Sequence, residues 1–193
     1  MFQQIFVIVG GLFGVFILYL VGRHVLASVS PETDEKIELY FMLKDINRHF
    51  GFLFEKGYKV REAHYSINPN GSWHVDLESK ECVVSIVQDR GEILTYVSPV
   101  FGSDASKSKI ALEAMIYLQS KGKNIIGRYV GNLAWDKKKQ FERLADLLRT
   151  YIDQIASYFK DDFRHDKYVF RNAEQEYSSA VSYRRRNKKL NHA

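Results

Sequence analysis

One stretch of the chain, Gly122 to Tyr129 (GKNIIGRY), has the glycine spacing of a phosphate-binding loop. A Walker A loop also needs, directly after its second glycine, a lysine that reaches the phosphates and a serine or threonine that holds magnesium, and this stretch has neither at those positions. Such a loop follows a strand, whereas Gly122 follows a segment with helical periodicity. We therefore interpret Gly122 as the end of a helix that is followed by a turn.

Two of the six histidines, His64 and His74, lie on strands that flank one turn, and Glu62 and Asp76 lie close by in the sequence. Imidazole and carboxylate groups are metal ligands, but a metal site needs them to converge. Ordinary solvated polarity of two strands explains these residues as well. We expect neither a metal site nor a cofactor here.

The expected register of this hairpin supports the same interpretation. A hairpin centred between Pro69 and Asn70 would place Tyr65 opposite His74, so that His64 and His74 become diagonal neighbours. Diagonal side chains of this kind need not share a face of the sheet.

The residues that could act as nucleophiles lack partners in the sequence. Cys82 begins an apolar strand with no adjacent histidine, which is typical of a core residue. No Gly-x-Ser-x-Gly or His-Glu-x-x-His motif is present, so we predict no catalytic residue. Asp89-Arg90-Gly91 is interpreted as a hairpin turn, and Asp89 and Arg90 could also form an exposed interaction corner.

Charge is distributed unevenly along the 193 residues, whose net charge is +5. The whole excess lies in residues 164–193, where eight Lys and Arg residues stand against three Asp and Glu residues. Five of these cations cluster near the C-terminus: Arg184, Arg185, Arg186, Lys188 and Lys189. The cluster could bind an anionic membrane leaflet or nucleic acid, or be solvated, and the neutral remainder of the chain disfavours nucleic acid as a partner.

The first 22 residues carry no charged side chain, and Ile5–Val21 contains thirteen Leu, Ile, Val or Phe residues. These residues favour the bilayer by roughly 4–8 kcal/mol, before the effects of glycine and of the ends. We predict a transmembrane helix over residues 1–24 and a juxtamembrane linker over residues 25–33. A cleaved signal peptide is the alternative, although no lysine or arginine precedes the apolar stretch.

The same segment also predicts the orientation of the chain in the membrane and its association with a second helix. Arg23 and Lys36 follow the apolar stretch, so we predict a single-pass membrane protein whose C-terminal domain is cytoplasmic. Gly10 and Gly14 form a G-x-x-x-G pair, which lets a second helix approach closely in lipid. This pair favours a homodimer or a helical membrane partner.

Residues 34–163 have the periodicities of an α+β domain. A helix is predicted from Thr33 or Asp34 to about Lys56, because apolar residues recur at steps of three and four, and Gly57 ends it. An antiparallel meander of four strands follows, over Tyr58–Ile67, Ser72–Glu78, Glu81–Gln88 and Glu92–Ser98. The third strand is the most apolar and should be central, and the first helix should cover one face of the sheet.

Helical periodicity returns after the sheet. Ser106 should cap a helix that runs to about Ser120, and Asp136 should cap a longer helix that runs to about Lys160. The apolar face of the longer helix consists of Phe141, Leu144, Leu148, Tyr151, Ile155 and Tyr158 or Phe159. Residues 164–193 are predicted to form a basic tail that is partly helical or disordered.

Part of this pattern resembles known proteins. The run from Phe50 to Tyr58 (FGFLFEKGY), the strand–turn–strand after it and the stretch from Val84 to Gly91 are similar to small bacterial α+β domains of unknown function, some of them immunity-type. The resemblance covers residues 43–97. It implies a non-enzymatic binding domain and assigns no site residues.

These observations together predict a non-catalytic, membrane-anchored accessory or scaffold protein whose cytoplasmic domain binds a protein partner. One alternative is a membrane-anchored enzyme with a polar site built from residues such as Asp76, Glu62 and Arg90. Another is a regulator that binds anionic lipid or nucleic acid through the basic tail.

Overall fold

The computed structural model describes residues 31–66, 72–100, 109–126, 136–161 and 167–190. The chain divides within helix α2 (Pro31–Glu55) into two units, Met1–Lys44 and Asp45–Ala193, and the second unit contains the whole sheet. Within the described ranges, no helix combines the length and the apolar character that a bilayer span requires. The predicted transmembrane helix over residues 1–24, with its glycine pair, lies outside those ranges.

Helix α2 begins at Pro31, earlier than the predicted start at Thr33 or Asp34. Proline suits the first helical position because the N–H that it lacks would have no helical partner there. The helix is kinked at Phe50, where φ is −114°. Gly57 adopts a φ of 88°, which confirms it as the residue that stops the helix.

Five antiparallel strands form one sheet in the order β1-β2-β3-β4-β5. The strands are β1 (Lys59–Ser66), β2 (Ser72–Glu78), β3 (Cys82–Asp89), β4 (Glu92–Pro99) and β5 (Ile110–Ala111). The predicted meander of four strands is confirmed, with β3 at its centre. The fifth strand corrects the prediction of a helix through Ile110, because Ile110 and Ala111 pair with Val97 and Tyr96 before the next helix begins.

The register of the first hairpin differs from the prediction by one residue. His64 lies opposite His74, and Tyr65 lies opposite Trp73. Because Ser66 pairs with Ser72, an odd number of residues connects the strands, whereas the predicted centre between two residues required an even number. The one-residue difference places the two histidines directly opposite each other.

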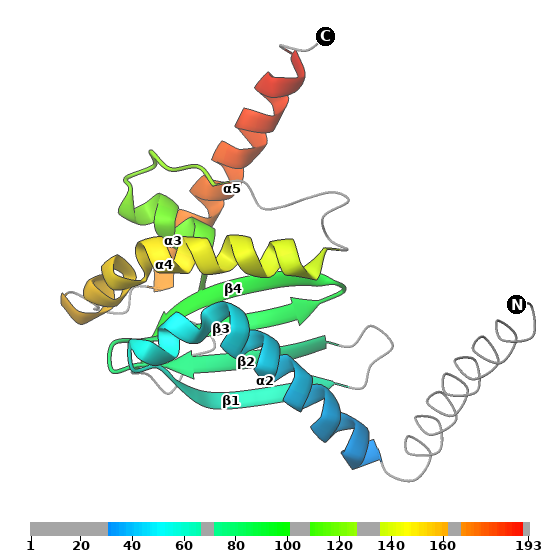
Figure 1. Ribbon diagram of the computed structural model, residues 1–193. Coiled ribbons are helices and arrows are strands. Elements are labelled where there is room, and N and C mark those ends of the chain that lie inside the picture. The colour runs from blue at the N-terminus through cyan, green and yellow to red at the C-terminus, as the bar shows by residue number, and fades with distance from the viewer. Residues whose placement is uncertain (1–30, 67–71, 101–108, 127–135, 162–166, 191–193) are drawn as a thin grey trace, which may run out of the picture. The chain divides into compact units, whose positions relative to one another are not determined.

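One face of the sheet carries the core. Trp73, Val75 and Leu77 of β2 alternate onto this face and are buried. The ring of Phe141 stacks on Trp73 at a centroid distance of 6.2 Å and meets the ring of Phe50 edge-on at 5.8 Å. Helix α4 (Lys137–Asp161) and the second half of α2 therefore cover this face, as Figure 1 shows.

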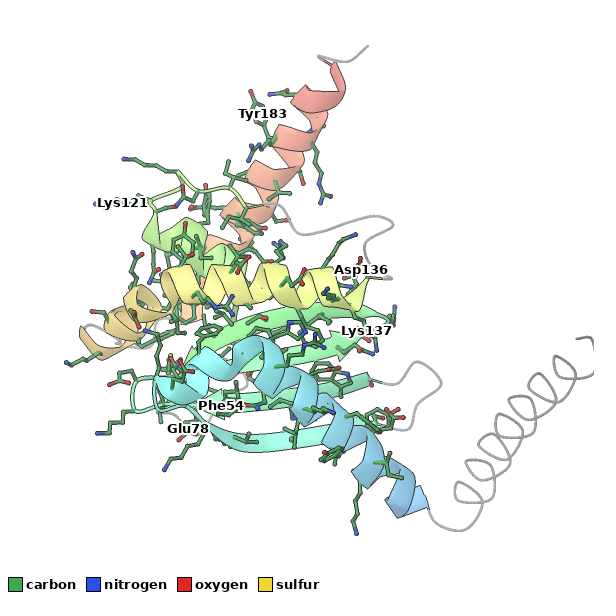
Figure 2. The ribbon with its side chains drawn as sticks, viewed as in Figure 1. Phe54, Glu78, Lys121, Asp136, Lys137 and Tyr183 are labelled. Carbon is green, nitrogen blue, oxygen red and sulfur yellow. The ribbon has the colours of Figure 1, made fainter. Side chains whose placement is uncertain are left out.

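Helix α4 has the predicted cap and ends at Asp161, close to the predicted end at about Lys160, and its buried face differs from the prediction at one residue. Asp136, labelled in Figure 2, caps the helix, because its Oδ1 accepts a hydrogen bond from the Lys139 N–H at 3.1 Å. Its large buried apolar residues are Phe141, Leu144, Leu148, Ile152, Ile155 and Phe159. Ile152 takes the position that was predicted for Tyr151, which is only half-buried.

Helix α3 (Leu112–Gln119) is shorter than predicted and starts directly after β5. Lys121 and Gly122 follow it with φ values of 52° and 80°, and the Gly122 N–H donates to the Tyr117 carbonyl at 2.9 Å. This geometry is that of a helix end, as predicted for Gly122.

The C-terminal region contains a long helix. Helix α5 spans Lys167–Leu190, 24 residues of the segment 164–193 for which a partly helical or disordered tail is predicted. Phe170, Ala173 and Tyr177 are buried on one side of its first half. The ring of Tyr177 meets Tyr117 of α3 at a centroid distance of 6.0 Å, and this packing holds α5 in place. Figure 1 shows the second half of α5 extending beyond the sheet, and Figure 2 labels Tyr183 on that part.

Candidate functional site

The face of the sheet opposite the core carries a row of polar side chains that crosses four strands. Glu62 of β1 lies opposite Asp76 of β2, Asp76 lies opposite Ser85 of β3, and Ser85 lies opposite Tyr96 of β4. Side chains directly opposite each other in neighbouring strands share a face. We call Glu62, Asp76, Ser85 and Tyr96 the polar row, and the face that carries them the second face.

The centre of the polar row is an ion pair at low exposure. Both carboxylate oxygens of Asp76 lie 3.4 Å from Nζ of Lys109, which precedes β5. Asp76 is only 7% exposed, and a carboxylate at that depth needs a charged or hydrogen-bonding partner. Lys109 therefore ties the segment that leads into β5 to the middle of the sheet.

Two histidines line a hollow on one side of the polar row. The rings of His64 and His74 lie 5.7 Å apart, and Nε2 of His74 lies 3.6 Å from Oε1 of Glu62. The hollow has a volume of about 360 Å³, and Val87, Leu94 and Tyr96 contribute to its wall. We call it the histidine hollow. In the part of the chain that the structure describes, no three His, Cys, Asp or Glu residues are placed to hold a metal ion.

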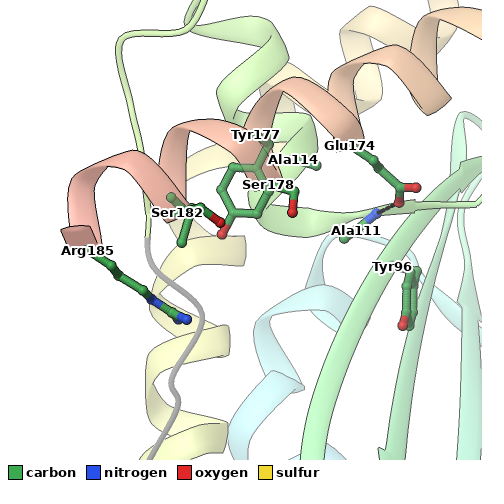
Figure 3. A pocket seen from close by; sticks show the side chains of 9 residues that line it. Tyr96, Ala111, Ala114, Glu174, Tyr177, Ser178, Ser182 and Arg185 are labelled. Atoms are coloured by element: carbon green, nitrogen blue, oxygen red, sulfur yellow. Dashed lines mark hydrogen bonds between the residues drawn. The ribbon is translucent and has the colours of Figure 1, made fainter.

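A second, larger hollow of about 510 Å³ lies between β4, the start of α3 and helix α5. Figure 3 shows it from close by, and we call it the α5 groove. Its α5 wall consists of Glu174, Tyr177, Ser178, Val181, Ser182 and Arg185. Oε1 of Glu174 accepts a hydrogen bond from the Ala111 N–H at 3.2 Å, so the groove has a fixed carboxylate towards one end and an arginine towards the other. Tyr96 lines both the groove and the histidine hollow.

The predicted basic tail is partly incorporated into this site. Arg184 donates from Nη1 to the Ile125 carbonyl at 2.8 Å, and Arg185 lines the α5 groove. Arg186 is exposed, and Lys188 and Lys189 lie in the last turns of α5. The five cations are therefore not equivalent, because at least one of them holds a neighbouring segment of the domain.

The predicted interaction corner lies apart from the polar row. Arg90 and Gly91 form the β3–β4 turn with φ values of 49° and 82°, and the Arg90 side chain is 82% exposed, 4.0 Å from Asp89. Ser85 precedes Arg90 by five positions in the sequence, which is about 16 Å along a strand. The structure thus brings Glu62 and Asp76 together and leaves Arg90 at the tip of a hairpin.

Cys82 is a core residue, as predicted. Its Sγ lies 3.0 Å from the hydroxyl of Tyr58, and the residue is buried. Burial raises the pKa of the Cys82 thiol and also that of the Tyr58 phenol. A thiol that resists deprotonation is a poor nucleophile, so Cys82 contributes to packing.

Sequence reasoning missed Tyr96, Lys109 and Glu174, although each lines or supports the site. These residues meet only because β5 pairs with β4 and α5 returns to the sheet, and neither event has a local signal in the sequence. The spacing of Glu174, Ser178 and Ser182 at steps of four was the available clue, since it places them on one side of a helix.

The candidate site is the polar row together with the histidine hollow and the α5 groove. It combines carboxylates, hydroxyls, imidazoles and one guanidinium around two hollows that share Tyr96. No known protein family, no curated protein and no solved structure matches this chain.

Proposed function

We propose that the chain is a non-catalytic, membrane-anchored accessory or scaffold protein whose α+β domain binds a protein partner on the second face. One observation carries this proposal. Tyr96 lines both the histidine hollow and the α5 groove, so the two hollows are neighbours, one with residues of β1 in its wall and the other with residues of α5. An elongated surface suits a segment of another protein better than it suits a compact small molecule.

The composition of the surface supports the same choice. Half-buried apolar side chains line the two hollows together with imidazole, hydroxyl and carboxylate groups: Val87 and Leu94 with His64 and His74, and Val181 with Ser178 and Glu174. Interfaces between separately folded proteins have this mixture of apolar and polar groups. Five strands span roughly 20 Å, which matches an extended segment of about six residues laid across them.

The anchor part of the proposal comes from the sequence. The apolar stretch Ile5–Val21 would hold the domain at the membrane, and Arg23 and Lys36 favour the cytoplasmic side. Confinement to a membrane raises the effective concentration of a protein towards partners in the same membrane. The non-enzymatic binding role that the resemblance of residues 43–97 implies agrees with this function.

Site-specific photocrosslinking in native membranes tests the proposal. Benzoylphenylalanine would replace Leu94 in the histidine hollow or Ser178 in the α5 groove, both in the full-length chain. Gln154, an exposed residue of α4, provides the matched control position. We expect the same heterologous protein to be crosslinked from both hollows and not from the position of Gln154.

A second variant makes the result specific to the site. Arg185→Glu reverses the charge at one end of the α5 groove and should abolish the adduct from the position of Ser178 while the chain stays in the membrane. Equal crosslinking from all three positions, or adducts that survive Arg185→Glu, would contradict the proposal. Self-adducts alone would show that the surface binds a second copy, and a chain released by carbonate would disprove the anchor.

A further inference from the structure

The first turns of α2 carry large apolar side chains on their outer side. Ile37, Tyr40 and Phe41 are 40%, 64% and 54% exposed, and the rings of Tyr40 and Phe41 meet edge-on at a centroid distance of 5.7 Å. Spacings of three and four place the three residues next to one another on one side of a helix. We call them the outer strip.

The outer strip is separate from the apolar face that the periodicity of α2 predicts. That face includes Leu39 and Leu43, which are half-buried and lie on roughly the opposite side of the helix from Ile37. The first half of α2 therefore has apolar residues on two sides. Exposed aromatic residues that are grouped in this way mark a surface that binds something apolar.

Two lysines identify the chemistry of that surface. Lys36 and Lys44 are exposed and lie four residues before and after Tyr40, so one lysine flanks each end of the outer strip, and the exposed Asp45 lies one turn after Phe41. Glu35 and Glu38 lie on the side of the helix that carries Met42, away from these lysines. An apolar aromatic strip bordered by lysines is the pattern of a helix that lies in a membrane interface.

The position of the strip in the chain brings a membrane within reach. Eight residues separate Gly22, the end of the uncharged N-terminal stretch, from Pro31, the start of α2. Eight residues extend at most about 30 Å, and Tyr40 lies about 14 Å further along the helix. If residues 1–24 span the bilayer, as the proposed function holds, the outer strip is tethered close to its surface.

We propose that Ile37, Tyr40 and Phe41 insert into the headgroup–acyl boundary of the membrane that anchors the chain, with Lys36 and Lys44 on anionic headgroups. This inference depends on the membrane anchor of the proposed function, and it is independent of the partner. It lays the first half of α2 along the bilayer, so that α2 is a second membrane contact beside the anchor.

Spin labelling of the full-length chain tests this contact. A nitroxide on Phe41→Cys would be compared with one on Tyr168→Cys, an exposed aromatic position on α5, in phosphatidylcholine vesicles that contain phosphatidylglycerol. Because Cys82 is buried, the wild-type chain serves as the labelling blank. We expect collisions with oxygen to dominate over collisions with a water-soluble nickel complex at position 41, at a depth of about 5–10 Å, and the reverse at position 168.

The depth of the label at position 41 also tests the role of the two lysines. Replacing Lys36 and Lys44 by glutamine should make the label at position 41 shallower in vesicles with phosphatidylglycerol. The same replacements should change its depth much less in pure phosphatidylcholine, because only the first membrane offers anionic headgroups. An identical depth in both membranes, with and without the lysines, would contradict their role.

The outcomes separate the two proposals. A chain that carbonate removes from the vesicles has no anchor, and the proposed function then fails together with this inference. A chain that stays in the membrane but exposes position 41 to the nickel complex keeps its anchor and overturns the inference. A label that neither reagent reaches is covered by protein, either a second copy or the N-terminal segment, which also overturns the inference.

Discussion

The side-chain amide of Gln140 on α4 hydrogen-bonds the backbone of Ile93 on β4, with Oε1 of Gln140 2.7 Å from the Ile93 nitrogen. Its Nε2 also donates to the Gly91 carbonyl at 3.2 Å. Strand β5 pairs only with Tyr96 and Val97, so it does not reach this part of β4. One glutamine on a helix thus provides hydrogen-bond partners for two backbone groups at the end of β4 that β5 does not reach.

Gln140→Leu should destabilise the domain by about 1–3 kcal/mol, because it leaves a buried N–H without its acceptor. Urea unfolding measures the free energy, and amide hydrogen exchange should show faster exchange at Ile93. Gln154→Leu, on the exposed side of the same helix, is the control and should change stability by less than about 0.5 kcal/mol. An unchanged exchange rate at Ile93 would show that the hydrogen bond from Gln140 does not protect this amide.

Helices α3 and α4 are joined by an ion pair with little exposure. Nη2 of Arg143 lies 2.9 Å from Oε1 of Glu113, and the two side chains are 19% and 7% exposed. Glu113→Ala should lower the free energy of unfolding by about 3 kcal/mol, because the guanidinium loses this partner in a site of low exposure. Replacing both residues by methionine should recover most of the loss.

The exposed pair Lys138–Glu142 on the same helix provides the comparison for this experiment. Its atoms lie 3.8 Å apart and its side chains are 70% and 50% exposed. Lys138→Ala should change stability by at most about 0.5 kcal/mol, since water screens such a pair. Equal losses of unfolding free energy for Glu113→Ala and Lys138→Ala would contradict the distinction between the buried and the exposed ion pair.

His49 should make the domain less stable in mild acid. Burial and the neighbouring Arg48 lower its pKa below the ordinary value of 6.5, and its ring stacks on Phe141 at a centroid distance of 5.0 Å. The unfolded chain therefore takes up a proton at a higher pH than the folded chain does. The contribution of neutral His49 to stability is fully present above the pKa that this histidine has in the unfolded chain. It decreases as the pH drops from about 6.5 towards the lower pKa of the folded chain.

Urea unfolding of the wild type and of His49→Gln across this pH window measures the effect. The variant should show a flatter dependence of the free energy of unfolding on pH, because glutamine does not titrate. A wild-type curve that falls with rising pH in this window would have the wrong sign for a histidine with a lowered pKa.

The Cys82 thiol should react only when the domain unfolds. Burial raises its pKa and excludes reagents, so both the thiolate fraction and the access are low in the folded chain. The rate of reaction with a disulfide reagent should rise with urea in parallel with global unfolding. Gln154→Cys adds an exposed thiol on α4, which should react at once, and an equally fast reaction of the wild type would refute the buried site.

Several elements of the fold were predictable because their signals are local. The alternation of Trp73, Val75 and Leu77 indicates a strand with one buried face, and the side chain of Asp136 caps the turn that follows it. Gly57 and Gly122 stop helices because their positive φ values suit glycine. Each of these signals depends on a few neighbouring residues, and the structure confirms them.

The candidate site was much less predictable. The sequence predicts Glu62 and Asp76 as candidate residues. The position of His64 opposite His74 depends on the centre of the hairpin loop, which lies at Pro69 and not between Pro69 and Asn70 as predicted. Tyr96, Lys109 and Glu174 come from three segments that meet at the edge of the sheet. Arg90 was grouped with the acidic residues, yet an extended strand separates it from them.

The sequence by itself determined the α+β class, the four long strands, the stops of α2 and α3 and the cap of α4. It determined them because hydrophobic period and turn chemistry act over one or two turns of chain. Only the tertiary structure decided that Ile110 and Ala111 form a strand and that α5 closes a groove over β4. A two-residue strand is too short to leave a periodic signal, and a polar helix such as α5 is fixed by the few apolar contacts that distant segments offer it.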